Sequence, residues 1–308
     1  MAEKIIVDPV TRIEGHLKIE VEVENGVVTN AWSSGNMARG IEVLLQDKDP
    51  RDAPYITSRI CGVCEGVHAI ASSFCLDNAF DVDVPEAGRL MRNLYCSAQY
   101  ITDHYIHFYI LSALDYLDVM AVADYAGNDA GLLAIRDKIR YLASKNDLSP
   151  FTPRYEPDEY CINDPEIVTT LVSHYIKAIE AKARSSKMRA MITGVQPHFN
   201  STMVGGCTAT PTVEQLREFK KLWLEEIDFV NNIYIPDVEY VGTGPLLELA
   251  TMGLGGGTQN YLCYPMFPQA DPASNTDRPF GGRNHMFKGG AIIGGALNPA
   301  EDVDYSKI

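Results

Sequence analysis

A long apolar run that begins at Pro85-Glu86 constrains the fold of this 308-residue chain more than any other feature. Leucine, isoleucine and aromatic side chains recur through it at helical spacing, at Leu90, Leu94, Ile101, Tyr105, Phe108 and Leu111. Apolar side chains surround the helix almost completely, and such a helix is stable only when other elements cover it. The sequence therefore predicts a long, buried central helix.

Two further helices follow. One should begin near Pro165 and run to about Arg189, and the next should begin at Thr212, where Gln215 three residues later completes a capping box. The apolar stripe predicted for the last helix consists of Leu216, Phe219, Trp223, Ile227 and Val230. Residues 127–165 are polar and are expected to pass over the surface of this helical bundle.

The ends of the chain favour strands. Apolar and charged residues alternate over 17–24, and Asn25-Gly26 leads into further valines, which predicts an antiparallel hairpin with one solvated face. From Val241 onward the chain is rich in glycine, which suits tight turns and short strands. We predict an α+β, mainly α fold: long buried helices in a bundle, an N-terminal antiparallel sheet and a short-stranded C-terminal region. No linker divides residues 1–308, so a single domain is expected.

Composition and charge exclude several classes of function. The net charge of −15 argues against nucleic acid or an anionic membrane as the main partner. No apolar run reaches the roughly 18 residues of a membrane-spanning helix, and the start MAEKIIVDPV has no signal-peptide pattern. The glycine-rich segment 253–258 lacks the Lys-Ser/Thr ending of a phosphate-binding loop, so we interpret it as a plain loop.

The stretch RICGVCEGVH carries the clearest chemistry, because it places Cys61 and Cys64 three residues apart. Such a pair serves in a zinc site, a redox disulfide or half of a larger metal site. No second pair follows at zinc-site spacing, which favours a site completed by residues that this chain does not hold. His68, one helical turn after Cys64, either donates a hydrogen bond to the sulfur or packs as an ordinary helix histidine. The other cysteines are expected to be buried as small apolar side chains: Cys75, Cys96, Cys161, Cys207 and Cys263.

Other polar residues stand out from their surroundings. Asp103 and His107 lie four residues apart in the most apolar helix, and a buried carboxylate must be paired. The partner of Asp103 is expected to be a cation or a nearby metal ligand. Alternatively, Asp103 forms a salt bridge that only fixes helix packing. Glu14 in TRIEGH and Glu42 in MARGIE either belong to a site or form surface salt bridges.

In combination these motifs resemble a known family. DPVTRIEGHLKIEVEVENG, MARGIEVLLQDKDPRDA, ITSRICGVCEGVHA and DHYIHFYILSALDYLDV occur in the order found in the N-terminal part of the [NiFe] hydrogenase large subunit. The resemblance continues through GVQPHFN, FVNNIYIPDV and GGAIIGG and covers nearly the whole chain. It implies an enzyme, a hydrogen:acceptor oxidoreductase that cleaves H2 reversibly and heterolytically to protons and electrons at a Ni–Fe centre. The electrons would pass to a small subunit that carries iron–sulfur clusters.

The resemblance assigns roles to residues around the metals. Cys61 would be a terminal nickel ligand, and Cys64 would bridge nickel and an iron that carries CO and CN ligands. Glu14 would pass protons, Glu42 would help to bind magnesium, and His68 would hydrogen-bond the bridging sulfur.

The same resemblance places four more residues in the surroundings. Asp103 would belong to the polar canopy over the metals, with His107 one turn further on. Arg59 and His198 would lie toward the small subunit.

The chain departs from the family pattern in one respect. The second cysteine pair, DPCxxCxxH near the end of the family's large subunit, is absent, and so are its arginine facing the iron and its C-terminal histidine at magnesium. Three explanations are a large subunit split into two polypeptides, a cleaved or partial chain, and a relative without metals. Cys61, Cys64, Glu14 and Asp103 favour the first two. A C-terminal half with the second pair is then the expected partner, and the enzyme would be active only with it and the small subunit.

Competing functions and locations stay open. One alternative is a metal-free, hydrogenase-related scaffold subunit of a respiratory complex, although those relatives lack the cysteine pair. The other is a zinc-stabilised structural module. The protein is expected at the membrane, anchored through other subunits, or in the periplasm through a co-exported small subunit, or alternatively in the cytoplasm.

Overall fold

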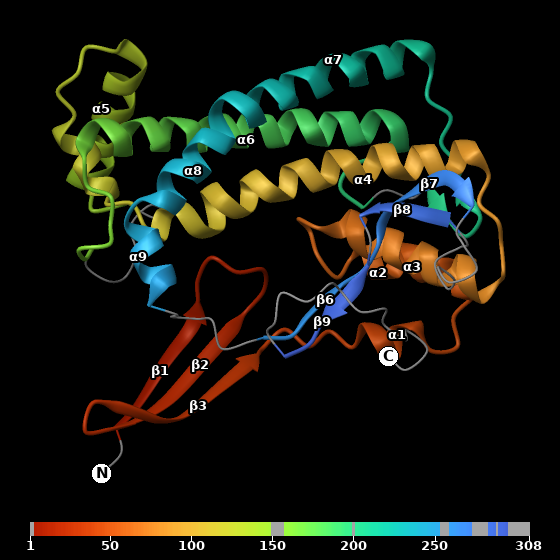
Figure 1. Cartoon of the computed structure of the whole chain (residues 1–308), viewed down its shortest axis with the longest axis horizontal. Helices are drawn as coiled ribbons and strands as arrows, with labels where there is room; N and C mark the ends of the chain where they lie inside the picture. Colours follow the sequence, from red (N-terminus) through yellow and green to blue (C-terminus); the bar gives the residue numbers. More distant parts are fainter. Residues whose placement is uncertain are drawn as a thin grey trace.

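The structure is a computed structural model that describes residues 3–148, 157–198, 201–252, 259–272, 283–287 and 289–294. Its long helices lie side by side above a small N-terminal sheet (Figure 1). The three longest are α4 (Glu86–Ile106), α6 (Pro165–Thr193) and α7 (Val213–Phe229). The remaining sheets of the described residues are small and antiparallel, so the predicted α+β, mainly α class is confirmed.

The N-terminal sheet contains the predicted hairpin and one strand more. Strands β1 (Glu3–Val10), β2 (Leu17–Glu24) and β3 (Val27–Gly35) pair antiparallel in that order. Asn25 and Gly26 both have positive φ, at 52° and 79°, which is the backbone that a two-residue hairpin turn requires. β1 was not predicted, because its apolar residues do not alternate with polar ones.

A group of short helices follows the sheet. They are α1 (Ile41–Leu45), the 3₁₀ turn η1 (Pro50–Asp52), α2 (Ala53–Ser58) and α3 (Glu65–Ala79). α2 and α3 pack against each other, and the segment between them carries the cysteine pair.

Helix α4 occupies the central position that the sequence predicts, between α6 on one side and α3 on the other (Figure 1). Its buried face matches the predicted apolar stripe only in part, since Tyr105 is fully buried but other buried positions are polar. Leu90 is 46% exposed, and the most deeply buried side chains include Arg92, Gln99 and Thr102. These polar side chains point inward because they form hydrogen bonds with other buried groups. The spacing of apolar residues in the sequence does not reveal such bonds.

Helix α4 continues into irregular turns. These are the π-helix η2 (His107–Ser112) and the 3₁₀ turns η3 (Ala113–Asp115) and η4 (Val119–Asp124). The surface excursion predicted over 127–165 contains a helix that was not predicted, α5 (Ala130–Ser144), in which only Ile139 is buried. Asp129 caps α5 by accepting a hydrogen bond from the Leu132 amide at 2.9 Å, so the polar residues of this segment include the start of a helix.

Helix α6 begins as predicted at Pro165, where the Asp164 side chain accepts from the Glu166 and Ile167 amides. It runs a turn beyond the predicted end and stops at Gly194, whose φ of 84° is the left-handed geometry of a helix C-cap.

The predicted capping box of α7 is present between Thr212 and Gln215. The predicted apolar stripe of α7 is partly wrong. Leu216 and Ile227 are exposed, whereas Leu222 and the charged Glu226 are buried.

From Val241 onward the described residues contain the short strands that the glycines predict, but also the helix Pro245–Thr251, which was not predicted. After α7 come the π-helix η5 (Val230–Tyr234), α8 (Ile235–Thr243) and α9 (Pro245–Thr251). Two short strands precede α7, β4 (Thr202–Met203) and β5 (Gly206–Cys207). Four follow α9: β6 (Tyr261–Cys263), β7 (Met266–Pro272), β8 (Arg283–Phe287) and β9 (Gly290–Ile292). The segment 253–258, interpreted as a loop, lies outside the described residues. No helix in the described part of the chain has both the length and the apolar character needed to cross a membrane.

Helix α6 connects the core. The described residues form three buried apolar clusters, and α6 contributes to each of them. Val168 and Leu171 belong to the first, Ala178 and Ala181 to the third, and Met188 to the second.

Candidate metal centre

The cysteine pair lies on a loop whose backbone directs donors toward one sulfur. α2 ends at Ser58, and Cys64 is the N-cap of α3. The Sγ atom of Cys61 accepts hydrogen bonds from the amides of Val63, at 3.3 Å, and Cys64, at 3.1 Å. Amides directed at a sulfur favour its thiolate form, so this loop is suited to present a metal ligand.

Arg39 secures the loop from the side of the N-terminal segment. Its guanidinium donates to the backbone carbonyls of Arg59, at 2.8 Å, and of Ile60, the residue before Cys61. Arg39 belongs to the same MARGIE motif as Glu42, and its guanidinium binds the backbone of the cysteine loop.

Glu14 reaches Cys61 from the connection between β1 and β2. Its Oε2 lies 3.8 Å from the Sγ of Cys61, a sulfur hydrogen bond across 47 residues of sequence. The following residue, Gly15, has a φ of 95°, a conformation that favours glycine and turns the chain back into β2.

His68 and Cys64 meet one helical turn apart. The Nε2 of His68 lies 3.5 Å from the Sγ of Cys64, within hydrogen-bond reach, and the tautomer of the ring decides which atom donates. Burial lowers the pKa of His68, so the ring is neutral near pH 7. Burial, followed by the neighbouring Cys61, raises the pKa of Cys64 to about 12. A bound cation would lower the pKa of Cys64, because it stabilises the thiolate directly.

Asp103 lies on α4 and is mostly buried. Its Oδ1 accepts a hydrogen bond of 2.6 Å from the side-chain amide of Gln99. The expected cation or metal ligand is therefore replaced, as direct partner, by a neutral amide. Burial raises the pKa of Asp103 to about 6, and the Gln99 hydrogen bond opposes that shift.

Four of the candidate residues do not contact the cysteines. Glu42 is exposed on α1, and His107 is exposed with its Nδ1 3.4 Å from the Ser112 hydroxyl. Arg59 donates to the Tyr55 carbonyl at 2.8 Å, and the Nδ1 of His198 lies 3.1 Å from the Ser58 carbonyl. Arg59 and His198 thus gather at the end of α2, next to the loop.

Sequence reasoning missed three buried residues near the loop: Glu65, Gln99 and Arg189. Each is at most 2% exposed, and Glu65 directly follows Cys64. Their charge or polarity inside apolar helices was the available signal, since buried polar groups need partners.

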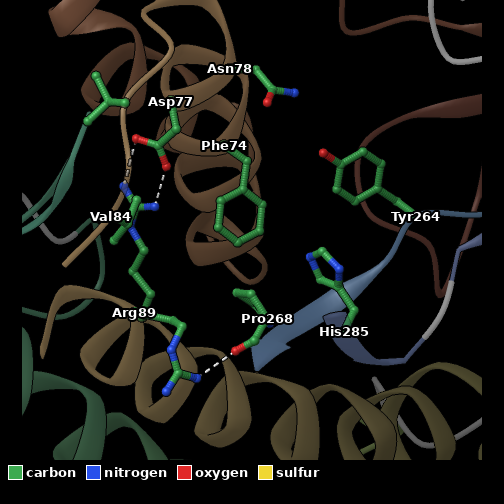
Figure 2. A pocket seen from close by; sticks show the side chains of 10 residues that line it. Phe74, Asp77, Asn78, Val84, Arg89, Tyr264, Pro268 and His285 are labelled. Atoms are coloured by element: carbon green, nitrogen blue, oxygen red, sulfur yellow. Dashed lines mark hydrogen bonds and ion pairs between the residues drawn. The ribbon is translucent and has the colours of Figure 1, made fainter. Parts of the chain in front are cut away.

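A separate small cavity, of about 50 Å³, lies between α3, α4 and the β7–β8 hairpin (Figure 2). Its acidic residue, Asp77, pairs with Arg92 at 2.5 Å and accepts from the Gly205 amide at 2.7 Å. Arg89 donates to the Pro268 carbonyl at 2.7 Å. These hydrogen bonds tie the elements together, and none of the predicted site residues lines this cavity.

The donor set fits part of a soft-metal centre. Cys61 and Cys64 are free thiols, and thiolates suit nickel, iron and zinc. Within the described residues, no group of three or more histidine, cysteine or acidic side chains has the arrangement of a metal site. The two thiols are chemically suited to be ligands of such a centre.

The fold and site together define a mainly helical protein in which two free thiols, a carboxylate and an imidazole lie close together. The chain belongs to the nickel-dependent hydrogenase family, whose model matches residues 39–308, while a HoxL-like model matches residues 4–33. This identifies the family that the motifs resemble.

Individual relatives agree with this assignment. The chain is 34% identical to the Hydrogenase-2 large chain of Escherichia coli (strain K12), over 95% of this chain and 54% of that one. It is 37% identical to the periplasmic [NiFeSe] hydrogenase large subunit of Desulfomicrobium baculatum, over 87% of this chain and 48% of that one. The solved Ni-Fe-Se hydrogenase from D. vulgaris Hildenborough in the reduced state superposes with a TM-score of 0.75 at 37% identity, over 96% of this chain and 53% of that one. The chain thus spans about half the length of the curated relatives it matches.

Proposed function

We propose that this chain is the N-terminal part of the catalytic large subunit of a [NiFe] hydrogenase, which cleaves H2 reversibly to protons and electrons. The observation that carries the proposal is the meeting of Glu14, Cys61, Cys64 and His68, which come from the β1–β2 connection and the α2–α3 region. A metal-free scaffold has little physical need for two free thiols faced by a carboxylate and an imidazole.

Cys61 and Cys64 would hold the metals. Both side chains are free thiols at the same loop, and as thiolates they would be two of the ligands of nickel and iron. The remaining two thiolates would come from the rest of the large subunit, as a second CxxC pair, on the same or on another polypeptide. A bound nickel–iron centre, its iron carrying CO and CN, supplies the Lewis acid and the redox chemistry that hydrogen cleavage needs.

Proton transfer is the task of this chain's own side chains. A terminal thiolate, Cys61 or its counterpart on the rest of the large subunit, would take up the proton released when H2 is cleaved. The carboxylate of Glu14, 3.8 Å from the Cys61 sulfur, would then receive that proton. The amides of Val63 and Cys64 stabilise the thiolate that remains.

The surrounding residues complete the proposal. Asp103 would form part of a polar canopy over the metals, with His107 one turn beyond, and Glu42 would contribute to a magnesium site. Arg59 and His198, gathered at the end of α2, would face a small subunit whose iron–sulfur clusters take the electrons. Residues 1–308 would act as one domain, completed by the other half of the large subunit.

Metal analysis of the native complex tests the proposal. We expect nickel and iron bound to the complex that contains this chain, and loss of nickel in Cys61→Ser. Cys75→Ser is the matched control, since Cys75 is an exposed thiol on α3, and it should retain the metals. Zinc at one ion per chain without nickel would support the structural module instead, and the absence of any metal would support the scaffold.

A further inference from the structure

We propose that Gln99 is a positioning residue of the metal centre, whose side-chain amide fixes the cysteine loop and the Asp103 carboxylate relative to each other. This inference rests on the proposed function, because it concerns the same site. Gln99 lies on α4, is 2% exposed and contacts neither cysteine sulfur through a hydrogen bond.

The amide nitrogen of Gln99 makes two hydrogen bonds. Nε2 donates to the backbone carbonyl of Val63, at 3.2 Å, and to the Oδ1 of Asp103, at 2.6 Å. Val63 lies between the two cysteines, so one amide group joins the loop that carries the thiols to the acid of the proposed canopy.

The side-chain amide of Gln99 cannot rotate by half a turn, exchanging its nitrogen and oxygen, without losing these hydrogen bonds. Its oxygen accepts from the Nη1 of Arg189, and a guanidinium has donors only. Arg189 therefore requires the oxygen on its own side, which leaves both N–H groups for Val63 and Asp103. Arg189 itself is 2% exposed and comes from α6.

Arg189 also holds the other side of Cys64. The same Nη1 lies 3.1 Å from the Oε1 of Glu65, the first residue of α3. This Oε1 also accepts from the side-chain amide of Gln196. Val63 and Glu65 flank Cys64 in sequence, so the network forms hydrogen bonds to the residues immediately before and after that cysteine.

The network contains buried polar atoms that lack a hydrogen-bond partner. Among the described residues, the buried side-chain nitrogen and oxygen atoms without a partner are Glu65 Oε2, Arg189 Nε and Ser201 Oγ. The first two belong to this network. Unpaired buried polar atoms cost stability and tend to be kept where function needs them, which here means beside Cys64.

Two substitutions separate positioning from simple packing. Gln99→Leu keeps most of the volume but removes both donors, which leaves the Val63 carbonyl unpaired. Gln99→Glu keeps the shape of the side chain but replaces the donating nitrogen with a carboxylate oxygen, which would face the Val63 carbonyl and the Asp103 carboxylate without a hydrogen to share. Both should release the loop, and Gln99→Glu does so with little change in packing.

Asn93→Leu is the matched control. Asn93 lies on the same helix, and its amide donates to the Pro268 carbonyl at 2.9 Å, away from the cysteine loop. This control therefore also loses an amide-to-carbonyl hydrogen bond from α4.

The purified complex that contains this chain is the test material. We expect Gln99→Leu and Gln99→Glu to release nickel roughly tenfold faster into EDTA and to change the nickel electron paramagnetic resonance signal. After metal removal, Cys64 should react with iodoacetamide roughly tenfold faster, as followed by mass spectrometry. Asn93→Leu should match wild type in all three measurements.

The outcomes distinguish this inference from the proposed function. If both Gln99 variants behave like Asn93→Leu in a complex that holds nickel, the inference is wrong and the proposed function stands. If the wild-type complex contains no nickel, the proposed function fails. The Cys64 reactivity then still decides whether Gln99 fixes the loop.

Discussion

The contact between Glu14 and Cys61 joins an acid from the N-terminal sheet to a thiol 47 residues later. A carboxylate can accept and release protons, and a separation within hydrogen-bond reach permits direct transfer. At the residue scale, the pair places the Cys61 sulfur within reach of Glu14, the side chain proposed to carry the proton.

Replacement of Glu14 tests this connection. Glu14→Gln should suppress hydrogen–deuterium exchange with solvent by 10²-fold or more, on the order expected for loss of a positioned acid–base group, while nickel stays bound. Mass spectrometry of HD formation measures the exchange. Glu20→Gln, on β2 and bonded to Lys4, is the control and should exchange normally. Normal exchange in Glu14→Gln would remove Glu14 from the proton path.

Asp103 should give the stability of the protein a distinctive pH dependence. Its folded-state pKa of about 6 lies above the ordinary value of roughly 3.9, so the folded state binds the proton more tightly than the unfolded state. The ionised carboxylate therefore costs stability above about pH 6, and the cost disappears as the pH falls toward about 4.

Asp103→Asn removes this ionisation. The variant should exceed wild type in free energy of unfolding at pH 8, on the order of 1–3 kcal/mol, and by clearly less at pH 5. Urea unfolding of the metal-depleted protein, followed by circular dichroism, provides the values. An equal difference at both pH values would contradict the assigned cause.

At the element scale, α3 and α4 pack unusually closely at Gly66. A Cβ atom at this position would lie 2.3 Å from the Cε1 of Tyr95, a ring that is 1% exposed and has little room to move. The close approach brings α3, which begins at the metal loop, onto the central helix.

Gly66→Ala should therefore destabilise the protein by about 1–3 kcal/mol through overpacking. Gly242→Ala, in α8, is the control because nothing lies within 4 Å of its added methyl group, and it should be neutral or slightly stabilising. Thermal unfolding compares the two. A smaller effect for Gly66→Ala than for Gly242→Ala would show that α3 and α4 separate easily.

Local signals in the sequence predicted the positions of several helices and turns and part of the candidate site. The α7 capping box, the start of α6 and the Asn25-Gly26 turn depend on neighbouring residues, so they could be read directly. The inward face of α4 could not, because Gln99 and Arg189 are buried by a mutual hydrogen bond across 90 residues of sequence. For the same reason Cys61 and Cys64 were identifiable from their motif, whereas Arg39, which binds the loop through backbone carbonyls, was not.

At the scale of the whole molecule, the N-terminal sheet exposes apolar side chains on its edge strands. Ile6 is 54% exposed on β1, and Val28 is 56% and Trp32 45% exposed on β3. Exposed apolar groups on unpaired strand edges are typical of surfaces that another chain covers. We expect the chain, expressed by itself, to self-associate through this sheet.

The double variant Ile6→Lys/Val28→Lys tests this expectation. Added charge on both edge strands should shift the isolated chain to a monomer in size-exclusion chromatography with light scattering. Lys187→Ala, an exposed change on α6, should leave the association unchanged. A wild-type chain that already elutes as a monomer would contradict the prediction.

Helix α6 runs through all three core clusters, which constrains how the molecule can open. Its 29 residues would have to lose contacts at Val168, Ala178 and Met188 together if the helix came away as a unit. Amide hydrogens along its length should then exchange with solvent through one shared opening event, at similar rates, while those of the exposed N-terminal sheet exchange earlier. The protein would keep its helical frame intact during local openings of the sheet that borders the cysteine loop.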